Sequence, residues 1–389
     1  MEKQASFKTN KIWLFSKQID LALLLIPVWC CWLVCFAMPD QLLQKELPLW
    51  FWAIFILGID VSHVWSTIFR TYLDREEFTQ HKTLLTYAPL IGFISFFALA
   101  SISQLWFWRV LAYMALYHFV KQQYGFLALY YLKSGKILHK KILKDRWIIY
   151  FGMLYPVAYW HLSGNRAFNW FVQNDFIDFG GSVGKGLGGN LSVYTQEVSY
   201  FVEQFLVISN YLYWVVLLLW LVEEWYLSRN NGSFQTGKVL WVLTTAVNWY
   251  LGIVYFNSDI AFSLTNVVAH GIPYMVLVFF YVEKKKQLKN SNQSVSFNLA
   301  KRSWSILLMF VLILVLAFGE EYLWDMLLYR EKQPLFEAMF SYPFEAAKSP
   351  FLQAIVLALL SIPQVSHYII DGYIWKGKKN PFVKRVFTE

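Results

Sequence analysis

The chain has 389 residues, of which 57% are hydrophobic, 20% aromatic and only 15% charged. Soluble domains carry about 25% charged residues, so this composition excludes an ordinary soluble protein and indicates an integral membrane protein. The net charge of +9 does not indicate nucleic-acid binding, because the basic residues gather between the apolar stretches. We therefore expect membrane lipid, and no nucleic acid, as a partner.

Ten stretches are long and apolar enough for transmembrane helices, which need about 20 residues each. They are 19–38, 49–72, 83–101, 108–132, 146–163, 205–227, 238–256, 259–283, 302–328 and 350–376. Because little sequence remains for loops and no repeat is visible, the sequence predicts an all-α fold, a polytopic transmembrane helix bundle forming one domain over 1–389. It also predicts one long outer loop, about 164–204, and a basic tail, about 376–389.

The distribution of positive charge predicts the orientation of the chain. If the lysine-rich N-terminus is cytoplasmic, alternate counting through ten spans places 26 of the 34 Lys and Arg residues inside and 7 outside. This asymmetry follows the positive-inside rule. We therefore expect both termini in the cytoplasm and a multi-pass protein of the cell membrane.

Four of the predicted spans each carry one histidine with a polar residue three or four positions away. Side chains at this spacing share one helix face, and ionisable groups within a membrane mark functional sites by default. The pairs are Asp60 with His63, His118 with Gln122, Asn266 with His270, and His367 with Asp371.

The depth of these histidines in the membrane suggests that they form one site. At 1.5 Å per residue, His63 lies about 21 Å from the outer end of its span, His118 about 15–18 Å, His270 about 16 Å and His367 about 25 Å. All four therefore fall between the middle and the inner leaflet of a core about 30 Å thick. Their spans also run in the same direction. The alternative is that each histidine makes an ordinary interhelical hydrogen bond, worth about 1 kcal/mol or less.

If the histidines bind a metal, their polar neighbours have a clear role. A metal-bound imidazole usually donates its other N–H to a carboxylate or carbonyl group, which fixes its tautomer. Asp60, Asp371, Gln122 and Asn266 are the expected acceptors. His81, at the start of the third span, is a further candidate ligand, whereas His139 and His161 are expected to be solvated.

Imidazole suits iron, zinc, copper and nickel, so the ligands alone do not name the metal. The sequence lacks the HxxxH and HxxHH boxes of membrane desaturases and hydroxylases, which argues against a di-iron site. One histidine per helix, at positions 63, 118, 270 and 367, resembles the bacterial carotene-cleaving dioxygenases of the Brp/Blh type. That resemblance implies an iron held by histidines alone.

Three functions are compatible with this pattern. The first is a metal-dependent membrane oxidoreductase or oxygenase, with iron favoured, that acts on an apolar, lipid-soluble small molecule. An electron-donor protein is a candidate partner for it. The second is haem-based electron transfer, with pairs of these histidines as axial ligands. The third is a transporter that uses the same polar groups as a proton or substrate site.

Overall fold

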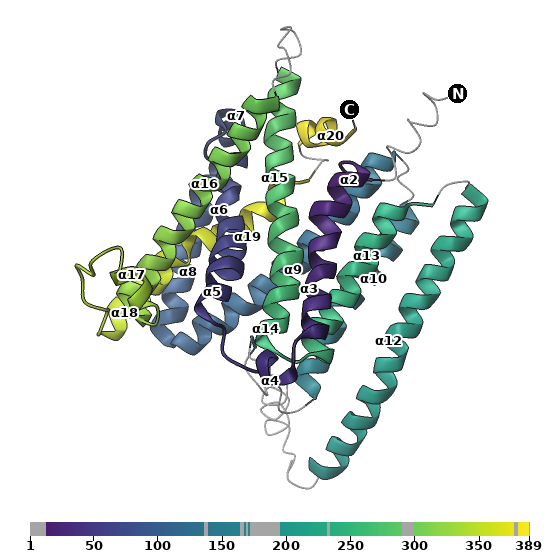
Figure 1. Cartoon of the computed structure of the whole chain (residues 1–389), viewed down its shortest axis with the longest axis horizontal. Coiled ribbons are helices and arrows are strands. Elements are labelled where there is room, and N and C mark those ends of the chain that lie inside the picture. The colour runs from purple at the N-terminus through teal and green to yellow at the C-terminus, as the bar shows by residue number, and fades with distance from the viewer. Residues whose placement is uncertain are drawn as a thin grey trace. The chain divides into compact units, whose positions relative to one another are not determined.

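The computed structural model describes residues 13–135, 139–163, 167–168, 170–171, 195–231, 234–289, 299–376 and 380–388. Within these ranges every regular element is a helix, which confirms the predicted all-α fold (Figure 1). Most of the predicted outer loop, 164–204, lies outside the described residues. The last part of that range, from Thr195, belongs to a long helix.

Among the described residues, seven helices are long and apolar enough to cross a membrane, or eight if one bent pair counts as a single span. The predicted spans 108–132 and 146–163 are helical but are not among them. Polar and charged residues such as Lys121 and Gln122 lower the hydropathy of the first of these. The prediction of ten spans with both termini inside therefore stays a prediction, whereas the membrane-type composition of the helices is clear.

Many large apolar side chains on these helices remain exposed. Tyr211, Leu308 and Ile91 are 72%, 70% and 56% exposed, respectively. Soluble monomers rarely leave large contiguous apolar surfaces in water, so these outward faces fit contact with lipid.

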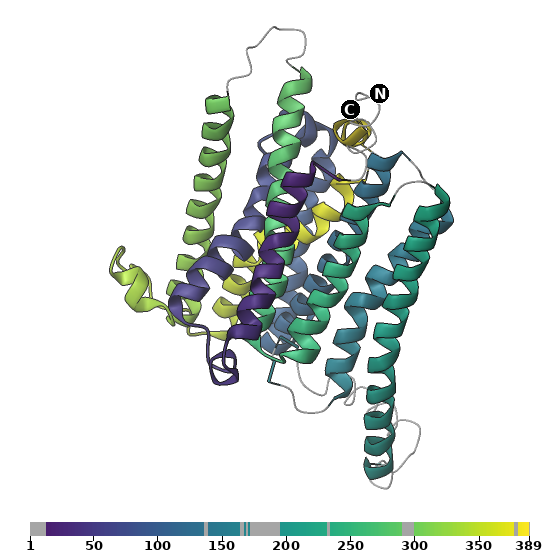
Figure 2. The ribbon, with the colours of Figure 1, turned by 45° about the vertical axis from the view of Figure 1, so that its right-hand side comes forward.

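The chain divides into two compact units, each assembled from separate parts of the sequence. Unit 1 comprises 1–46 and 122–269. Helix α10 packs against α12 and α13 in this unit, and Figures 1 and 2 show the long α12 at its edge. Its helices are α2 (Lys17–Ile19), η1 (Asp20–Leu25), α3 (Ile26–Ala37), α4 (Asp40–Leu43), α10 (His139–Leu162), α12 (Thr195–Asn231), α13 (Thr236–Trp249), η4 (Tyr250–Tyr255), α14 (Asp259–Phe262) and η5 (Ser263–Val267).

Unit 2 comprises 47–121 and 270–389. Helix α8 packs against α18 and α19, and α16 packs against η2 and α6. Its helices are α5 (Leu49–Phe51), η2 (Trp52–Val61), α6 (Ser62–Arg70), α7 (Arg75–Gln80), α8 (Lys82–Ile102), α16 (Leu299–Trp324), η7 (Asp325–Tyr329), α17 (Gln333–Glu337), α18 (Pro350–Leu360), α19 (Ile362–Ile374) and α20 (Pro381–Thr388). Helices α9 (Gln104–Ser134) and α15 (Val268–Lys289) contribute to both units. The division into two compact units does not test the prediction that residues 1–389 form one domain.

Candidate metal centre

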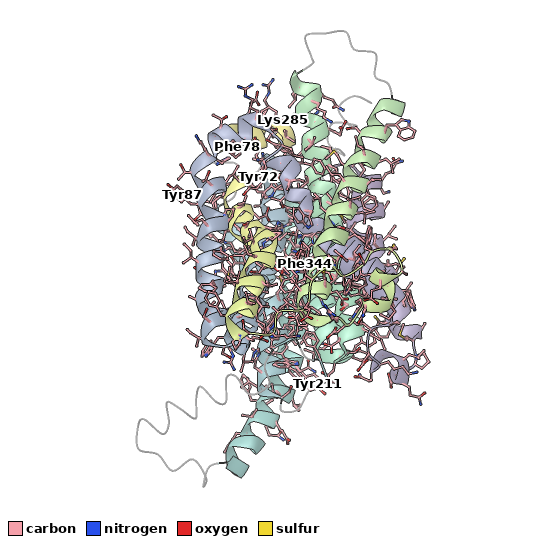
Figure 3. The ribbon with its side chains drawn as sticks, turned by 90° about the vertical axis from the view of Figure 1, so that its left-hand side faces the viewer. Tyr72, Phe78, Tyr87, Tyr211, Lys285 and Phe344 are labelled. Carbon is pink, nitrogen blue, oxygen red and sulfur yellow. The ribbon has the colours of Figure 1, made fainter. Side chains whose placement is uncertain are left out.

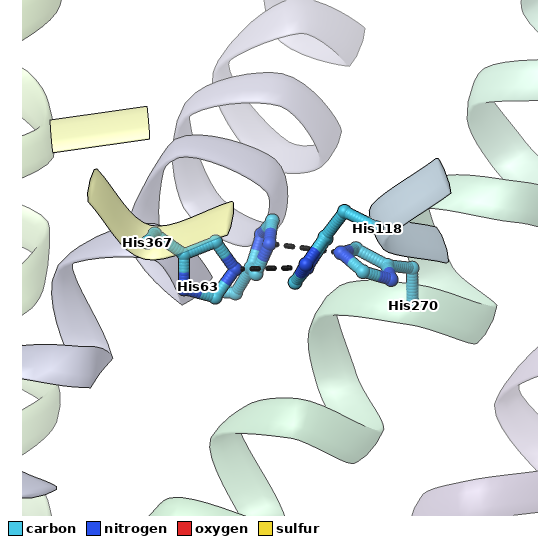
Figure 4. Close-up of side chains that lie close together, drawn as sticks. All are labelled: His63, His118, His270 and His367. Carbon is cyan, nitrogen blue, oxygen red and sulfur yellow. Dashed lines mark hydrogen bonds between the residues drawn. The ribbon is translucent and has the colours of Figure 1, made fainter. Parts of the chain in front are cut away.

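The four predicted histidines all belong to unit 2, where their imidazoles converge (Figure 4). One ring nitrogen of each lies within 4.8 Å of the corresponding nitrogens of the other three. His63 and His270 approach through their Nε2 atoms at 3.0 Å, and so do His118 and His367. The four side chains are between 1% and 3% exposed. The sequence prediction that they share one location within the bundle is thus matched by the structure.

These distances fit a single transition-metal ion. Metal–nitrogen bonds of about 2.0–2.1 Å place neighbouring ligand nitrogens about 3.3 Å apart in a tetrahedral site, and about 2.9 Å apart at right angles. The two Nε2 pairs at 3.0 Å already have this spacing. The other nitrogen–nitrogen separations are at most 4.8 Å, and those wider than a metal site allows must shorten. The four histidines could therefore hold a transition metal with small side-chain adjustments.

Neighbouring imidazole rings of the cluster stand steeply to one another. The planes of His63 and His270 meet at 86°, and those of His118 and His270 at 85°. Aromatic side chains enclose the group: Tyr368 stacks on His118 at 4.7 Å, and Phe119 contacts His270 at 4.0 Å between ring centroids. The aromatic residues of this region thus line the site.

His63 stands directly after an irregular stretch of helix. The π-helical η2 ends at Val61 and α6 begins at Ser62, whose hydroxyl donates to the carbonyl of Leu57, five residues earlier. A wide π turn leaves such carbonyls open to a side-chain donor, and π turns are common at functional sites. This junction brings the Asp60 carboxylate to 3.6 Å from Nδ1 of His63.

His270 depends on a close approach between helices and on a proline. A Cβ on the neighbouring Gly271 would lie 2.6 Å from Cγ2 and 3.1 Å from the carbonyl oxygen of Ile59, so only glycine lets α15 lie this close to η2. Pro273 has no N–H to donate to the Ala269 carbonyl within the helix. The Gln123 amide donates to that carbonyl at 3.2 Å instead. The helix therefore continues through the proline without an unpaired acceptor.

His367 follows the bend between α18 and α19. These two helices meet at Ser361 with an angle of 41°, and Pro363 occupies the first turn of α19, where its missing N–H costs no hydrogen bond. Gly92 of α8 approaches Val365 closely, since a Cβ there would lie 3.1 Å from Cγ1. The bend and the close packing together hold α19 beside α8.

The Nδ1 atom of His367 points away from the cluster, to the Thr67 hydroxyl at 2.7 Å. Thr67 in turn lies 3.1 Å from the hydroxyl of Tyr274, which donates to Asp371 at 2.8 Å. The sequence suggested that Asp371 could orient His367 within the same helix. The structure instead places two hydroxyls from other helices between them. Neither was visible in the sequence, because their positions depend on how α6 and α15 pack.

The other polar residues from the sequence analysis have different surroundings. His81 is outside the cluster, with its Nε2 atom 3.8 Å from Glu77. Gln122 and Asn266 belong to unit 1, where Asn248 donates to Asn266 at 2.9 Å, and their role beside the histidines stays a prediction.

His161 is only 2% exposed, and its Nδ1 atom lies 2.8 Å from the Val157 carbonyl oxygen. The expectation that His161 is solvated was therefore wrong, because Trp160 and Phe171 cover it. The side chain of His139 lies outside the described residues.

A buried ionic network lies at one end of unit 2. Arg70 is fully buried, pairs with Glu77 at 2.7 Å and donates to the Ile374 carbonyl at 2.9 Å. Lys285 reaches Asp74 at 2.7 Å, and Figure 3 shows this lysine at the same end of the unit as Tyr72 and Phe78. These contacts join the carboxyl ends of α6, α15 and α19. Three of the histidine-bearing helices therefore run in the same direction, as the sequence analysis expected.

Unit 1 contains a second ionic network. Lys238 lies 2.7 Å from Asp145 and 2.8 Å from Glu224, and Lys141 pairs with the same two carboxylates. Glu224 of α12 is buried. Its partners come from α10 and α13, so the network depends on how these three helices pack.

Comparison with known protein families, curated proteins and solved structures finds no match to this chain. The resemblance to carotene-cleaving dioxygenases therefore rests on the histidine pattern alone.

Proposed function

We propose that this protein is a metal-dependent oxidoreductase of the cell membrane, with iron as the favoured metal and a lipid-soluble small molecule as substrate. One observation carries the proposal: four buried imidazoles from four helices place a ring nitrogen of each within 4.8 Å of the others. Imidazole is the commonest metal ligand in proteins. A structural role for each histidine alone gives no reason for all four to meet at one point.

The ligand set favours a transition metal over magnesium or calcium. Hard ions such as magnesium and calcium prefer oxygen ligands, whereas imidazole suits iron, copper, nickel and zinc. Four protein ligands close a tetrahedral zinc site, which is the pattern of structural zinc. Iron accepts more than four ligands, so an iron ion held by the four histidines would keep coordination positions for other molecules. When bound, such an ion would supply dioxygen activation or polarisation of a substrate.

The residues around the histidines favour an apolar substrate. Phe119, Tyr274 and Tyr368 contact the imidazoles, and all four histidine side chains are shielded from solvent. Such a site excludes water and attracts apolar ligands. Because the surrounding helices have the length and composition of membrane spans, a substrate would reach it from the lipid phase.

The two alternative functions fit this geometry less well. A porphyrin supplies four nitrogens to its own iron and leaves two axial positions, so a haem has no use for four imidazoles at one point. A proton or substrate relay needs polar groups spaced along a path, whereas these four nitrogens gather around one centre. We therefore favour a non-haem metal.

The experiment is purification in detergent, followed by elemental analysis and absorption spectroscopy. We expect about one transition-metal ion per chain, with iron the most abundant, and no Soret band. His63→Ala, His118→Ala, His270→Ala and His367→Ala should each lose the metal, because three ligands bind far more weakly than four.

His161→Ala is the matched control, since His161 is equally buried but bonds to its own helix backbone. It should keep the metal. A strong Soret band would point to haem instead. Metal-free wild-type protein that cannot be loaded with iron, cobalt or zinc would overturn the proposal.

A further inference from the structure

Three helices contribute to one hydrogen-bonded chain that leads away from the metal centre. It starts at Nδ1 of His367 and passes through the hydroxyls of Thr67 and Tyr274 to the carboxylate of Asp371. Its three links measure 2.7, 3.1 and 2.8 Å, and Thr67 and Tyr274 are 4% and 0% exposed. Because water has no access to these hydroxyls, their hydrogen-bond partners must come from the protein.

The hydrogen atoms of this chain can be placed in order. The indole of Trp375 can only donate, so Oδ1 of Asp371, 2.6 Å away, acts as an acceptor. Tyr274 donates its single hydrogen to the same oxygen. The Tyr274 oxygen therefore accepts from Thr67, which in turn leaves the Thr67 oxygen to accept from His367. The imidazole thus carries its proton on Nδ1.

This order leaves a lone pair on the other nitrogen of His367. Nε2 is the atom that faces His118 at 3.0 Å inside the cluster. A metal ligand must present an unprotonated nitrogen, so the chain selects the tautomer that can bind a metal. We propose that Thr67 and Tyr274 are positioning residues that hold His367 in its metal-binding tautomer by linking it to the carboxyl group of Asp371. The inference deepens the proposed function and rests on it for the metal-binding role.

The hydroxyls of Thr67 and Tyr274 link the Asp371 carboxyl group to His367. The contact of the Tyr274 ring with His367, at 4.9 Å between centroids, further restricts the tilt of the imidazole.

Thr67→Val and Tyr274→Phe test the inference, because each removes a hydroxyl and keeps the shape of the side chain. Thr67→Ser is the matched control, since it keeps the hydroxyl. The first measurement uses metal-free protein labelled with ¹⁵N at histidine, with the His367 signal assigned by its loss in His367→Asn. We expect protonated Nδ1 in the wild type and Thr67→Ser, and a shift towards protonated Nε2 in Thr67→Val.

The second measurement is the affinity for Co²⁺, followed by its visible absorption. Loss of an outer hydrogen bond to a metal ligand typically weakens binding about 10–100-fold. We expect losses of this size for Thr67→Val and Tyr274→Phe, and a near-normal affinity for Thr67→Ser. An unchanged tautomer in Thr67→Val, or wild-type affinity in both hydroxyl deletions, would overturn the inference. If wild-type protein bound no Co²⁺, the metal-binding function would fail, while the tautomer comparison would still decide the role of the chain.

Discussion

At the scale of single residues, one ionic network of unit 2 lies apart from the four imidazoles of the histidine cluster. Arg70 and Lys285 lie further along α6 and α15, and both pair with Glu77 of α7. Seven residues separate His63 from Arg70, which is about 10 Å along a helix. Arg70 lies 3.8 Å above the ring of Tyr281 and 4.9 Å from that of Trp375. These charged groups thus tie the helices together at a distance from the histidine cluster.

Replacing Glu77 tests the ionic network. Glu77→Gln leaves the buried guanidinium of Arg70 without a charged partner, and breaking a buried ion pair typically costs about 3–5 kcal/mol. We expect a loss of this size in the free energy of unfolding, measured by denaturant titration in detergent. Glu345→Gln is the control, because Glu345 and Lys348 are 81% and 80% exposed and such a pair contributes about 0–1 kcal/mol. Equal effects of both substitutions would contradict the structural role of Glu77.

The same network should make stability depend on pH. Burial raises the pKa of Glu77, but the charge of Arg70 and the Tyr281 hydrogen bond outweigh it and hold this pKa below its usual 4.5. For Asp74, the Lys285 hydrogen bond outweighs burial and likewise lowers the pKa. A carboxyl group with a lowered folded-state pKa stabilises the fold above its unfolded pKa, and this contribution is lost as the pH falls through the folded value. We expect unfolding free energy to fall below about pH 4.5, with a shallower fall in Glu77→Gln.

Only some residues of the candidate site could be predicted from the sequence. His63, His118, His270 and His367 were identifiable because a histidine within an apolar span is conspicuous. Thr67 and Tyr274 were not, because a threonine or tyrosine is ordinary in such a span. The burial of Arg70 and Glu77 was not visible either, because it depends on the packing of α15 and α19 against them.

At the scale of helices, three of the four histidine-bearing segments are irregular close to the histidine. The π-helical η2 ends two residues before His63, η5 ends three residues before His270, and a bend precedes His367. Sequence periodicity assumes a regular helix, so it predicted the existence of these helices well and their local geometry poorly. The spacing of Asp371 and His367 predicted that the carboxyl group could orient an imidazole, within its own helix or across helices, but not the chain through Thr67 and Tyr274 that depends on the packing of α6 and α15.

Gly271 provides a test of this close helix packing. Gly271→Ala would place its Cβ against Ile59, so η2 and α15 must separate and move His63 away from His270. We expect Gly271→Ala to lower the metal content and the unfolding temperature. Gly319→Ala, in α16, is the control, because a Cβ there has open space. If the two variants retained the same metal content, the close approach would not be needed for the site.

At the scale of the whole molecule, the direction of the chain through the membrane is the main open prediction. It rests on the 26 positive residues expected inside against 7 outside. Within unit 2, the basic residues Arg70 and Lys285 do meet at one end, next to the carboxyl end of α19. Basic residues resist transfer across the membrane during insertion, so this end should face the cytoplasm.

Cysteine labelling in sealed membranes can determine the orientation. After replacement of Cys30, Cys31 and Cys35, single cysteines are introduced in place of exposed lysines. Lys144→Cys and Lys376→Cys should react with an impermeant reagent only from the cytoplasmic side, because positive-inside counting places both there. Lys45→Cys and Lys348→Cys should react only from the outside. If Lys376→Cys and Lys348→Cys reacted from the same side, α18 and α19 would not form one complete span. The ten-span topology would then be wrong at its last crossing.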